Sequence, residues 1–230
     1  MYYLALAADF DDTLAQDGIV AQATLTGLAR LRETGRRLVL VTGRELADLQ
    51  AISAPLEAFH FVVAENGAVL YCPGSPEQTL LAQPPPPGFA VALRRRGVSP
   101  LTVGRVIVAT REPHQDTVLE TIRELGLELH VIFNKGAVMV LPSGVNKATG
   151  LTAALAQLKI SPARVVGVGD AENDQAFLAR CKTAVAVANA LPALKNKVDL
   201  VTRAANGAGV VELIDRLVQD DLADLASRRS

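Results

Sequence analysis

Short apolar runs that each stop at a polar cluster are the feature that most constrains the fold of this chain. Three occur in its first third: Tyr2–Ala8 before Asp9-Phe10-Asp11-Asp12, Leu38–Val41 before Thr42-Gly43-Arg44, and Phe61–Ala64 before Glu65-Asn66-Gly67. Two stretches between these runs, Ala21–Thr34 and Glu45–Ile52, carry leucines at helical spacing. Short buried strands that alternate with helices predict an α/β fold with a parallel sheet and right-handed crossovers.

The same alternation returns in the C-terminal part of the chain. Its expected elements are helix Lys147–Leu158, strand Val165–Val168, helix Ala176–Arg180, strand Ala184–Val187, helix Leu191–Asn196, strand Leu200–Thr202 and helix Gly209–Leu217. We therefore expect residues 1–71 and 144–230 to form one α/β core domain.

Residues 72–143 interrupt the pattern and predict a small α+β insert. The proline-rich stretches at 73–76 and 84–88 are interpreted as linker and loop, because proline does not fit the interior of a helix or central strand. A strand at Arg105–Thr110 and a helix at His114–Leu125 should follow, and then a hairpin over 129–141. Asn134 and Lys135 at the hairpin tip are interpreted first as ordinary turn residues, and second as contacts to a ligand.

Composition excludes several classes of protein. The chain has 230 residues, half of them hydrophobic, with a net charge of −1, and this balance excludes general disorder and a strongly basic nucleic-acid binder. No apolar run is long enough for a membrane span. Cys72 and Cys181 are too few for a disulfide framework, which favours a reducing cytoplasm.

Four polar clusters should meet in space, because ligand sites of open α/β sheets lie at the carboxyl ends of the strands. The clusters are Asp9, Asp11 and Thr13; Thr42 and Gly43; Lys147; and Asp170, Asn173 and Asp174. Carboxylates crowded together repel one another unless a cation intervenes, and a site with only oxygen ligands favours Mg²⁺. An isolated Asp more often caps a helix or turn, so the prediction depends on the convergence of all four clusters.

The remaining polar groups of these clusters suit a phosphate. Thr42 supplies a hydroxyl, Gly43 lets backbone N–H groups approach an anion, and Lys147 supplies a positive charge. One carboxylate could attack phosphorus to form an aspartyl-phosphate, and a second could protonate the leaving oxygen and then activate water. The partner predicted by this chemistry is a small phosphorylated metabolite.

These residues, in this order, resemble the haloacid dehalogenase superfamily of phosphohydrolases. The motifs are DxDxT at Asp9-Phe10-Asp11-Asp12-Thr13, the Thr after the next strand at Thr42, the Lys at Lys147, and GDxxND at Gly169-Asp170-Ala171-Glu172-Asn173-Asp174. Glu65-Asn66-Gly67-Ala68 and the segment from Asn189 to Val210 are similar to the Cof-type branch. This branch implies a Rossmann-like core with a mobile cap inserted between the second and third motifs, and the short cap resembles those of small phosphoglycolate and sugar phosphatases.

The resemblance also implies roles for individual residues. Asp9 would be the nucleophile and a Mg²⁺ ligand, and Asp11 the general acid/base with its backbone carbonyl on the metal. Asp170 and Asp174 would complete the metal site. The residues implied on the phosphate or substrate side are Thr42, Gly43, Arg44, Asn66, Lys147 and Asn173. Asp12 stands where many members have Gly, and we expect its side chain to point away.

Two alternatives stay open and one is disfavoured. A phosphomutase would use the same aspartyl-phosphate and return the phosphoryl group to a sugar, and a catalytically silent protein would only bind phosphate. A response-regulator receiver places its phospho-acceptor after a middle strand, whereas Asp9 follows the first expected strand. Dehalogenases of the superfamily lack the second Asp of the first motif, so Asp11 favours ester hydrolysis.

Overall fold

One large sheet organises most of the molecule. The computed structural model describes residues 1–52 and 54–226, and within them eight strands form a sheet in the order β14-β13-β12-β1-β4-β5-β6-β7. The strands are β1 Ala5–Ala8, β4 Arg37–Val41, β5 Phe61–Ala64, β6 Val69–Cys72, β7 Ser75–Leu80, β12 Val165–Gly169, β13 Thr183–Ala186 and β14 Leu200–Val201. From β14 to β5 all neighbours are parallel, as predicted.

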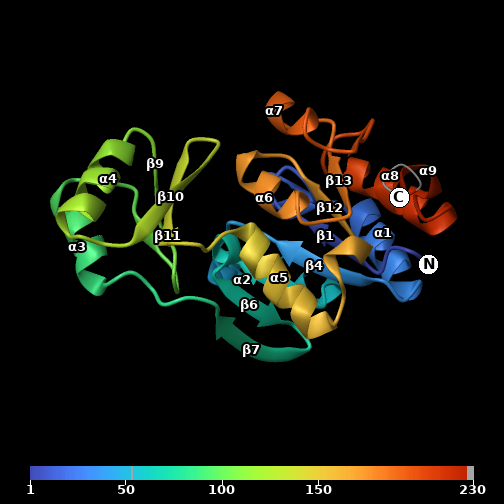
Figure 1. The fold of residues 1–230 in the computed structure, drawn as a ribbon, viewed down its shortest axis with the longest axis horizontal. Helices are drawn as coiled ribbons and strands as arrows, with labels where there is room; N and C mark the ends of the chain where they lie inside the picture. The colour runs from blue at the N-terminus through green and yellow to red at the C-terminus, as the bar shows by residue number, and fades with distance from the viewer. Residues whose placement is uncertain (53, 227–230) are drawn as a thin grey trace.

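Helices cover both faces of this sheet (Figure 1). The helices of the core are α1 Gln22–Glu33, α2 Leu46–Ala51, α5 Lys147–Leu158, α6 Gln175–Leu178, α7 Pro192–Lys195, α8 Asn206–Gln219 and α9 Ala223–Ala226. Helix α5 packs on α6 and on β4 and β5, while α1 packs against α8. Strand β1 is buried along its whole length between these layers, which explains its uniformly apolar sequence.

A second, smaller sheet forms the cap, the lobe that carries α3 and α4 in Figure 1. Its strand order is β10-β11-β9-β8, with β8 Thr102–Val103, β9 Val108–Arg111, β10 Leu129–Asn134 and β11 Ala137–Pro142. Helices α3 Pro87–Arg95 and α4 Gln115–Glu124 cover one face of this sheet. Phe89 and Leu93 of α3 pack there with Val118 and Ile122 of α4, which gives the cap its own core.

The proline-rich stretches are not simply linker and loop, and that prediction is wrong in two places. Ser75–Leu80 forms β7, the edge strand of the core sheet, and pairs antiparallel with β6. An edge strand is where a sheet tolerates proline. Pro87 opens α3 at its first position, where a missing N–H costs nothing. The core sheet therefore continues past Cys72 to Leu80.

Several short elements complete the chain. They are the hairpin β2 Ala15–Gln16 and β3 Ile19–Val20, and the 3₁₀ turns η1 Leu56–Ala58, η2 Glu65–Gly67, η3 Pro162–Arg164 and η4 Glu172–Asp174. In the part of the chain that the structure describes, no helix has the length and apolarity that a membrane crossing requires.

Candidate active site

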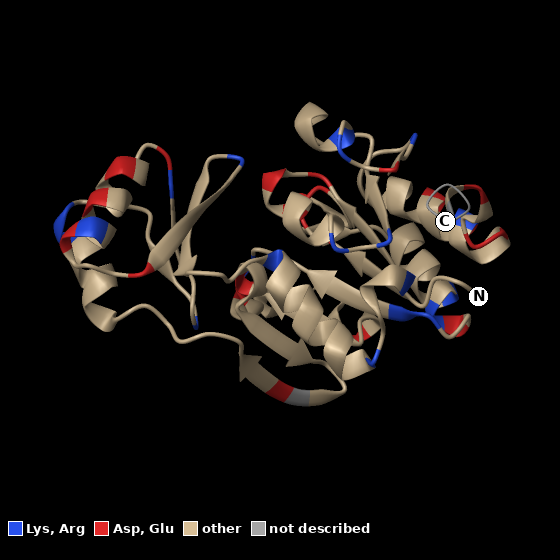
Figure 2. Ribbon diagram, in the orientation of Figure 1, with Lys and Arg blue, Asp and Glu red and all other residues tan. Residues whose placement is uncertain are grey.

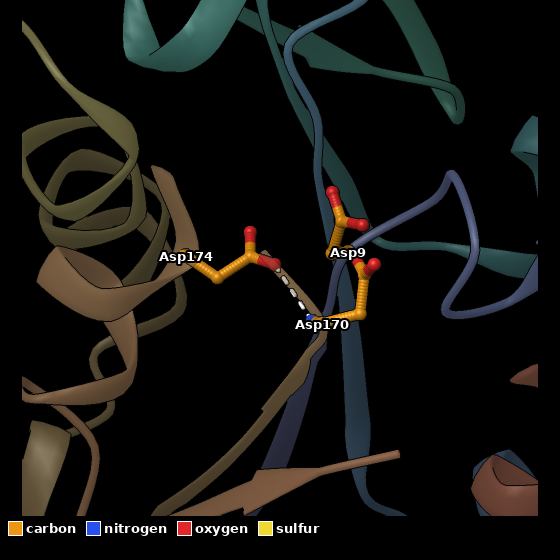
Figure 3. A group of neighbouring side chains, drawn as sticks. All are labelled: Asp9, Asp170 and Asp174. Atoms are coloured by element: carbon orange, nitrogen blue, oxygen red, sulfur yellow. Dashed lines mark hydrogen bonds between the residues drawn. The ribbon is translucent and has the colours of Figure 1, made fainter. Parts of the chain in front are cut away.

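Three aspartates converge at the carboxyl end of the core sheet. Asp9 follows β1, Asp170 follows β12, and Asp174 ends η4. One carboxylate oxygen from each lies within 4.8 Å of the others, and all three residues are buried. Figure 3 shows Asp9 and Asp170 side by side, with the carboxylate of Asp174 turned toward them. The predicted convergence of the first and last motifs is therefore present in the structure.

Lys147 holds this acidic group together. Its Nζ donates to Asp9 Oδ1 at 2.5 Å and to Asp174 Oδ1 at 2.6 Å, and its side chain is 1% exposed. Burial would lower the pKa of Lys147, but the charges of Asp174 and Asp9 outweigh burial and raise it. Burial raises the pKa of Asp9 well above its ordinary value, and the charge of Asp174 raises it further against the opposing effect of Lys147.

Lys147 owes its position to the start of α5. Asn146 is the N-cap, and its Oδ1 accepts from the N–H groups of Ala148 at 2.9 Å and Thr149 at 3.2 Å. Thr149 Oγ1 accepts from the Asn146 N–H in return, which completes a capping box. Because Lys147 is the first residue of the helix, its side chain reaches back across the ends of the strands.

Asp174 also shapes the loop after β12. Its Oδ2 accepts from the N–H groups of Asp170 at 2.8 Å and Ala171 at 3.0 Å, the first of which is drawn in Figure 3. Asp174 does not line the cavity described below, whereas Asp170 does. Thr13 Oγ1 approaches Asp170 Oδ1 at 3.4 Å from the β1 side.

Asp11 lies at the rim of the site, apart from the three buried acids. Its side chain is 45% exposed and makes a two-pronged ion pair with Arg44, with Nη2 to Oδ1 at 2.7 Å and Nε to Oδ2 at 2.8 Å. The family resemblance implies that Arg44 lies on the substrate side of the site. The structure gives it a contact with Asp11 that holds the carboxylate at the mouth of the cavity.

The predicted phosphate-side residues gather at the end of β4. Gly43 lines the cavity, and a Cβ built there would lie 3.7 Å from Asn173 Nδ2. Asn173 donates to Asn66 Oδ1 at 3.2 Å, and Asn66 Nδ2 and Asn173 Oδ1 are buried without a partner among the described residues. Thr42 is fully buried beneath them, and its Oγ1 accepts from the Arg44 N–H. Thr42 and Asn66 do not line the cavity themselves.

The tip of the cap hairpin closes the site from above. Lys135 Nζ donates to Asp170 Oδ2 at 2.5 Å and to Asp12 Oδ2 at 2.6 Å. In Figure 2 the hairpin tip is blue and faces red segments of the core. The expectation that Asp12 points away is wrong. Its φ of +56° explains why glycine suits this position, yet its carboxylate turns inward to Lys135.

Core and cap enclose a cavity of about 440 Å³. Its floor is formed by core residues: Asp9, Asp11, Asp12, Gly43, Arg44, Glu45, Asp48, Lys147, Asp170 and Asn173. Its roof is formed by cap residues: Thr102, Ile107, Ala109, Arg111, Asn134, Lys135, Ala137 and Met139. A space of this size can hold a small molecule, and the buried Lys147 below it offers a positive charge.

Glu65 links the core to the cap through contacts that the sequence did not reveal. Its buried carboxylate accepts from three backbone N–H groups of the turn between β8 and β9, those of Arg105, Val106 and Ile107, at 2.8–2.9 Å. A Cβ at Gly104 would lie 2.9 Å from this carboxylate, so glycine permits the close approach. Glu65 thus fastens the cap to the core beside the cavity, although the sequence marked it only as part of a family motif.

The remaining candidates lie outside the cavity. Arg94, Arg95 and Arg96 end α3 on an exposed surface, and Arg96 pairs with Glu124. His60 Nδ1 accepts from the Leu38 N–H at 3.1 Å, which is a structural role. Their absence from the cavity agrees with the interpretation of these residues as structural or solvated.

Comparison with known proteins identifies the family of this chain. The model of the haloacid dehalogenase-like hydrolases matches residues 6–84 and 100–214. A phosphoglycolate phosphatase from Methanothermobacter thermautotrophicus is 32% identical over 223 residues, covering 93% of this chain and 98% of that protein. A phosphoglycolate phosphatase from Haloarcula marismortui is 31% identical over 218 residues, covering 91% and 95%.

Solved structures show the same fold. A haloacid dehalogenase-like hydrolase from Bacteroides thetaiotaomicron superposes with a TM-score of 0.79 at 21% identity, covering 94% of this chain and 99% of that one. The matched residues include the four motifs and most of the cap. The chain belongs to the haloacid dehalogenase-like hydrolases.

Proposed function

We propose that this chain is a Mg²⁺-dependent phosphatase that hydrolyses small phosphate monoesters, with phosphoglycolate and sugar phosphates as the candidate substrates. The observation that carries the proposal is the buried group of Asp9, Asp170, Asp174 and Lys147 beneath the cavity between core and cap. The names of the two related phosphoglycolate phosphatases support phosphoglycolate in particular.

The acidic group fits a Mg²⁺ ion. Every candidate ligand atom in it is a carboxylate oxygen, the donor type that Mg²⁺ prefers. Burial and neighbouring carboxylates raise the pKa of Asp9, and a bound cation would counter that destabilisation of the charged form. Asp9, Asp170 and Asp174 would hold the ion together with the backbone carbonyl of Asp11. When bound, Mg²⁺ supplies charge neutralisation for the phosphate oxygens.

The residues of the floor can carry out the hydrolysis in two steps. In the first, an Asp9 carboxylate oxygen attacks phosphorus, and the leaving alkoxide takes a proton from Asp11. In the second, Asp11 takes a proton from water, the water oxygen attacks the phosphorus of phospho-Asp9, and inorganic phosphate is released. Lys147 keeps the Asp9 carboxylate oriented and offsets negative charge in both steps. Gly43 and Asn173 line the cavity, where the backbone N–H of Gly43 and the side-chain N–H₂ of Asn173 can donate to the phosphate oxygens.

Hydrolysis of p-nitrophenyl phosphate with and without Mg²⁺ tests this proposal. We expect turnover that needs Mg²⁺ and that Asp9→Asn abolishes, while Asp116→Asn on the exposed surface of α4 keeps it. A panel of phosphate esters then ranks phosphoglycolate against sugar phosphates. Folded protein without turnover on any ester would contradict the proposal and favour a mutase or a phosphate-binding protein.

A further inference from the structure

The roof of the cavity presents an ordered set of side chains on one face of the cap sheet. In the strand register, Arg111 of β9 pairs with Ala137 of β11, which pairs with Asn134 of β10. The next row on that face places Ala109 of β9 beside Met139 of β11. The row nearest the hairpin tip is therefore polar with a small residue at its centre, and the row behind it is apolar.

The charged side chains of the roof are both cations. Arg111 and Lys135 are the charged residues that the cap contributes to the cavity lining, whereas Asp9, Asp11, Asp12 and Asp170 are among the acids below. Since the acids and Lys147 already account for a phosphoryl group and its metal, the two roof cations can recognise a different part of the substrate.

Both cations have donors left for a ligand. Two of the three Lys135 ammonium protons are used, one on Asp12 and one on Asp170. The Arg111 guanidinium makes no hydrogen bond or ion pair with any residue that the structure describes, although it lines the cavity. Between them, Asn134 has a buried amide oxygen without a partner among the described residues.

We propose that Arg111 and Lys135 form an anion subsite that binds a carboxylate carried on the leaving group of the substrate. The proposal rests on the proposed phosphatase function and narrows its substrate class to short phosphorylated acids. Two cations with unused donors suit a carboxylate better than an uncharged sugar hydroxyl, because a carboxylate accepts from both and their charges offset its own. Lys135 Nζ is 2.5 Å from Asp170 Oδ2, and Asp170 belongs to the acidic group proposed to bind the metal and the phosphoryl group. A substrate carboxylate on Lys135 would therefore lie close to the phosphoryl group.

The apolar roof residues support a short substrate. Ile107 and Met139 are buried and pack with the core cluster, and a Cβ at Gly43 would lie 3.5 Å from Met139 Sδ. The roof therefore comes down to the floor directly behind the polar row. This limits how far a substrate can extend behind the polar row and favours a short leaving group.

A pair of substrates that differ in the carboxylate tests the subsite. The measured quantity is the ratio of kcat/KM for phosphoglycolate to kcat/KM for ethyl phosphate. We expect Lys135→Met and Arg111→Met each to lower this ratio by about tenfold to a hundredfold, the effect of losing one charged hydrogen bond. Arg95→Met removes a cation from the exposed end of α3 and should leave the ratio unchanged.

The ratio of the two kcat/KM values distinguishes recognition of the carboxylate from a role of Lys135 in holding the cap on the core. If Lys135 only held the cap against Asp12 and Asp170, Lys135→Met would slow both esters equally and the ratio would stay constant. A constant ratio in both roof variants would overturn the proposal, and so would an equal loss in Arg95→Met.

A binding measurement keeps this inference distinct from the proposed function. 3-Phosphonopropionate is the uncleavable isostere of phosphoglycolate, and propylphosphonate lacks its carboxylate. By calorimetry in Mg²⁺, we expect the wild-type protein to bind 3-phosphonopropionate at least about tenfold more tightly, and Lys135→Met to lose most of that preference. Equal affinity for the two phosphonates would overturn the proposed subsite, even if the enzyme turns over phosphate esters. A clear preference for 3-phosphonopropionate would support the subsite, even if no ester is hydrolysed.

Discussion

The floor and the roof of the cavity differ in how their side chains are held. On the floor, Asp9 and Lys147 are buried, and Lys147 is fixed by short contacts to Asp9 and to Asp174, which lies beneath the floor. On the roof, Lys135 is 37% exposed and stands on a two-residue hairpin turn. A rigid, desolvated group suits bond making and breaking, whereas a turn on a separate lobe suits selection among substrates.

The two regions also depend on different parts of the sequence. The floor combines strand ends from opposite ends of the chain, brought together by the pairing of β1 with β12. The roof is local, since β9, β10 and β11 are neighbours in the chain. Changes in the polar row of the roof can therefore alter substrate selection without disturbing the core sheet, whereas a change at Asp9 or Lys147 affects chemistry and stability together.

Removal of one lysine from each region should give the largest contrast. Lys147→Met leaves Asp9 and Asp174 buried without their cation, so we expect turnover of p-nitrophenyl phosphate to fall on the order of 10³-fold. Lys135→Met should have a much smaller effect on this substrate, which carries no carboxylate. Lys159→Met, at the exposed end of α5, is the matched control. An equal loss of p-nitrophenyl phosphate turnover in the Lys147 and Lys135 variants would contradict the distinction between a catalytic floor and a selective roof.

Gly67 tests how tightly the core is packed around the start of α5, which carries Lys147 of the floor. Its φ is +108°, and a Cβ there would lie 1.9 Å from the carbonyl oxygen of Asn146, the residue before Lys147. We expect Gly67→Ala to lower the free energy of unfolding by about 3 kcal/mol, measured by urea denaturation, because the start of α5 must shift. Gly74→Ala, with no atom within 4 Å, should change it by less than about 0.5 kcal/mol.

Glu65 joins the two regions, and its removal should loosen the roof. Glu65→Gln replaces an acceptor of three backbone N–H groups with a side chain that carries an N–H₂ of its own. We expect a loss of about 1–3 kcal/mol of stability and faster hydrogen exchange at residues 105–107. Glu77→Gln on the exposed β7 strand is the control. Unchanged exchange at 105–107 would show that Glu65 does not fasten the cap.

His60 should produce the smallest effect, because it lies outside both regions at the start of β5. Burial lowers its pKa below the ordinary value of 6.5, so the folded chain keeps it neutral while the unfolded chain takes up a proton. The stability contributed by neutral His60 is therefore present above pH 6.5 and decreases as the pH falls below it. His60→Asn keeps an acceptor for the Leu38 N–H and should make denaturation less pH-dependent from pH 7 to 5. An identical pH dependence would contradict this role.

Much of the floor could be predicted from the sequence, because strand-end residues of a parallel sheet must meet. That rule positions Asp9 after β1 and Asp170 after β12, whereas Asp174 and Lys147 join them from η4 and from the first residue of α5. The roof could not be predicted in the same way. Which hairpin residue reaches the core depends on how the cap docks, and no local periodicity records that. The sequence therefore favours an ordinary turn residue at Lys135 and does not single out Arg111.

The fold was mispredicted where tertiary pairing overrides local composition. The proline-rich stretch after Cys72 has the composition of a linker, yet β7 forms there because β6 offers an open edge. The hairpin of β2 and β3 is too short to give a strand pattern. Strand β7 is the edge strand of the core sheet, and β2 and β3 form a separate hairpin. Neither lies among the central strands, so the predicted parallel pairing of the central strands is unaffected.

The account depends most on Asp9 as the nucleophile, and chemical trapping tests this directly. Asp11→Asn should slow the hydrolysis of phospho-Asp9 but not its formation from p-nitrophenyl phosphate, whose leaving group needs no proton. After acid quenching, borohydride converts an aspartyl-phosphate to homoserine, which peptide mass spectrometry locates. We predict homoserine at position 9 in the presence of Mg²⁺ and substrate. Turnover by the wild-type enzyme without homoserine at position 9, or with homoserine at another aspartate, would contradict the account.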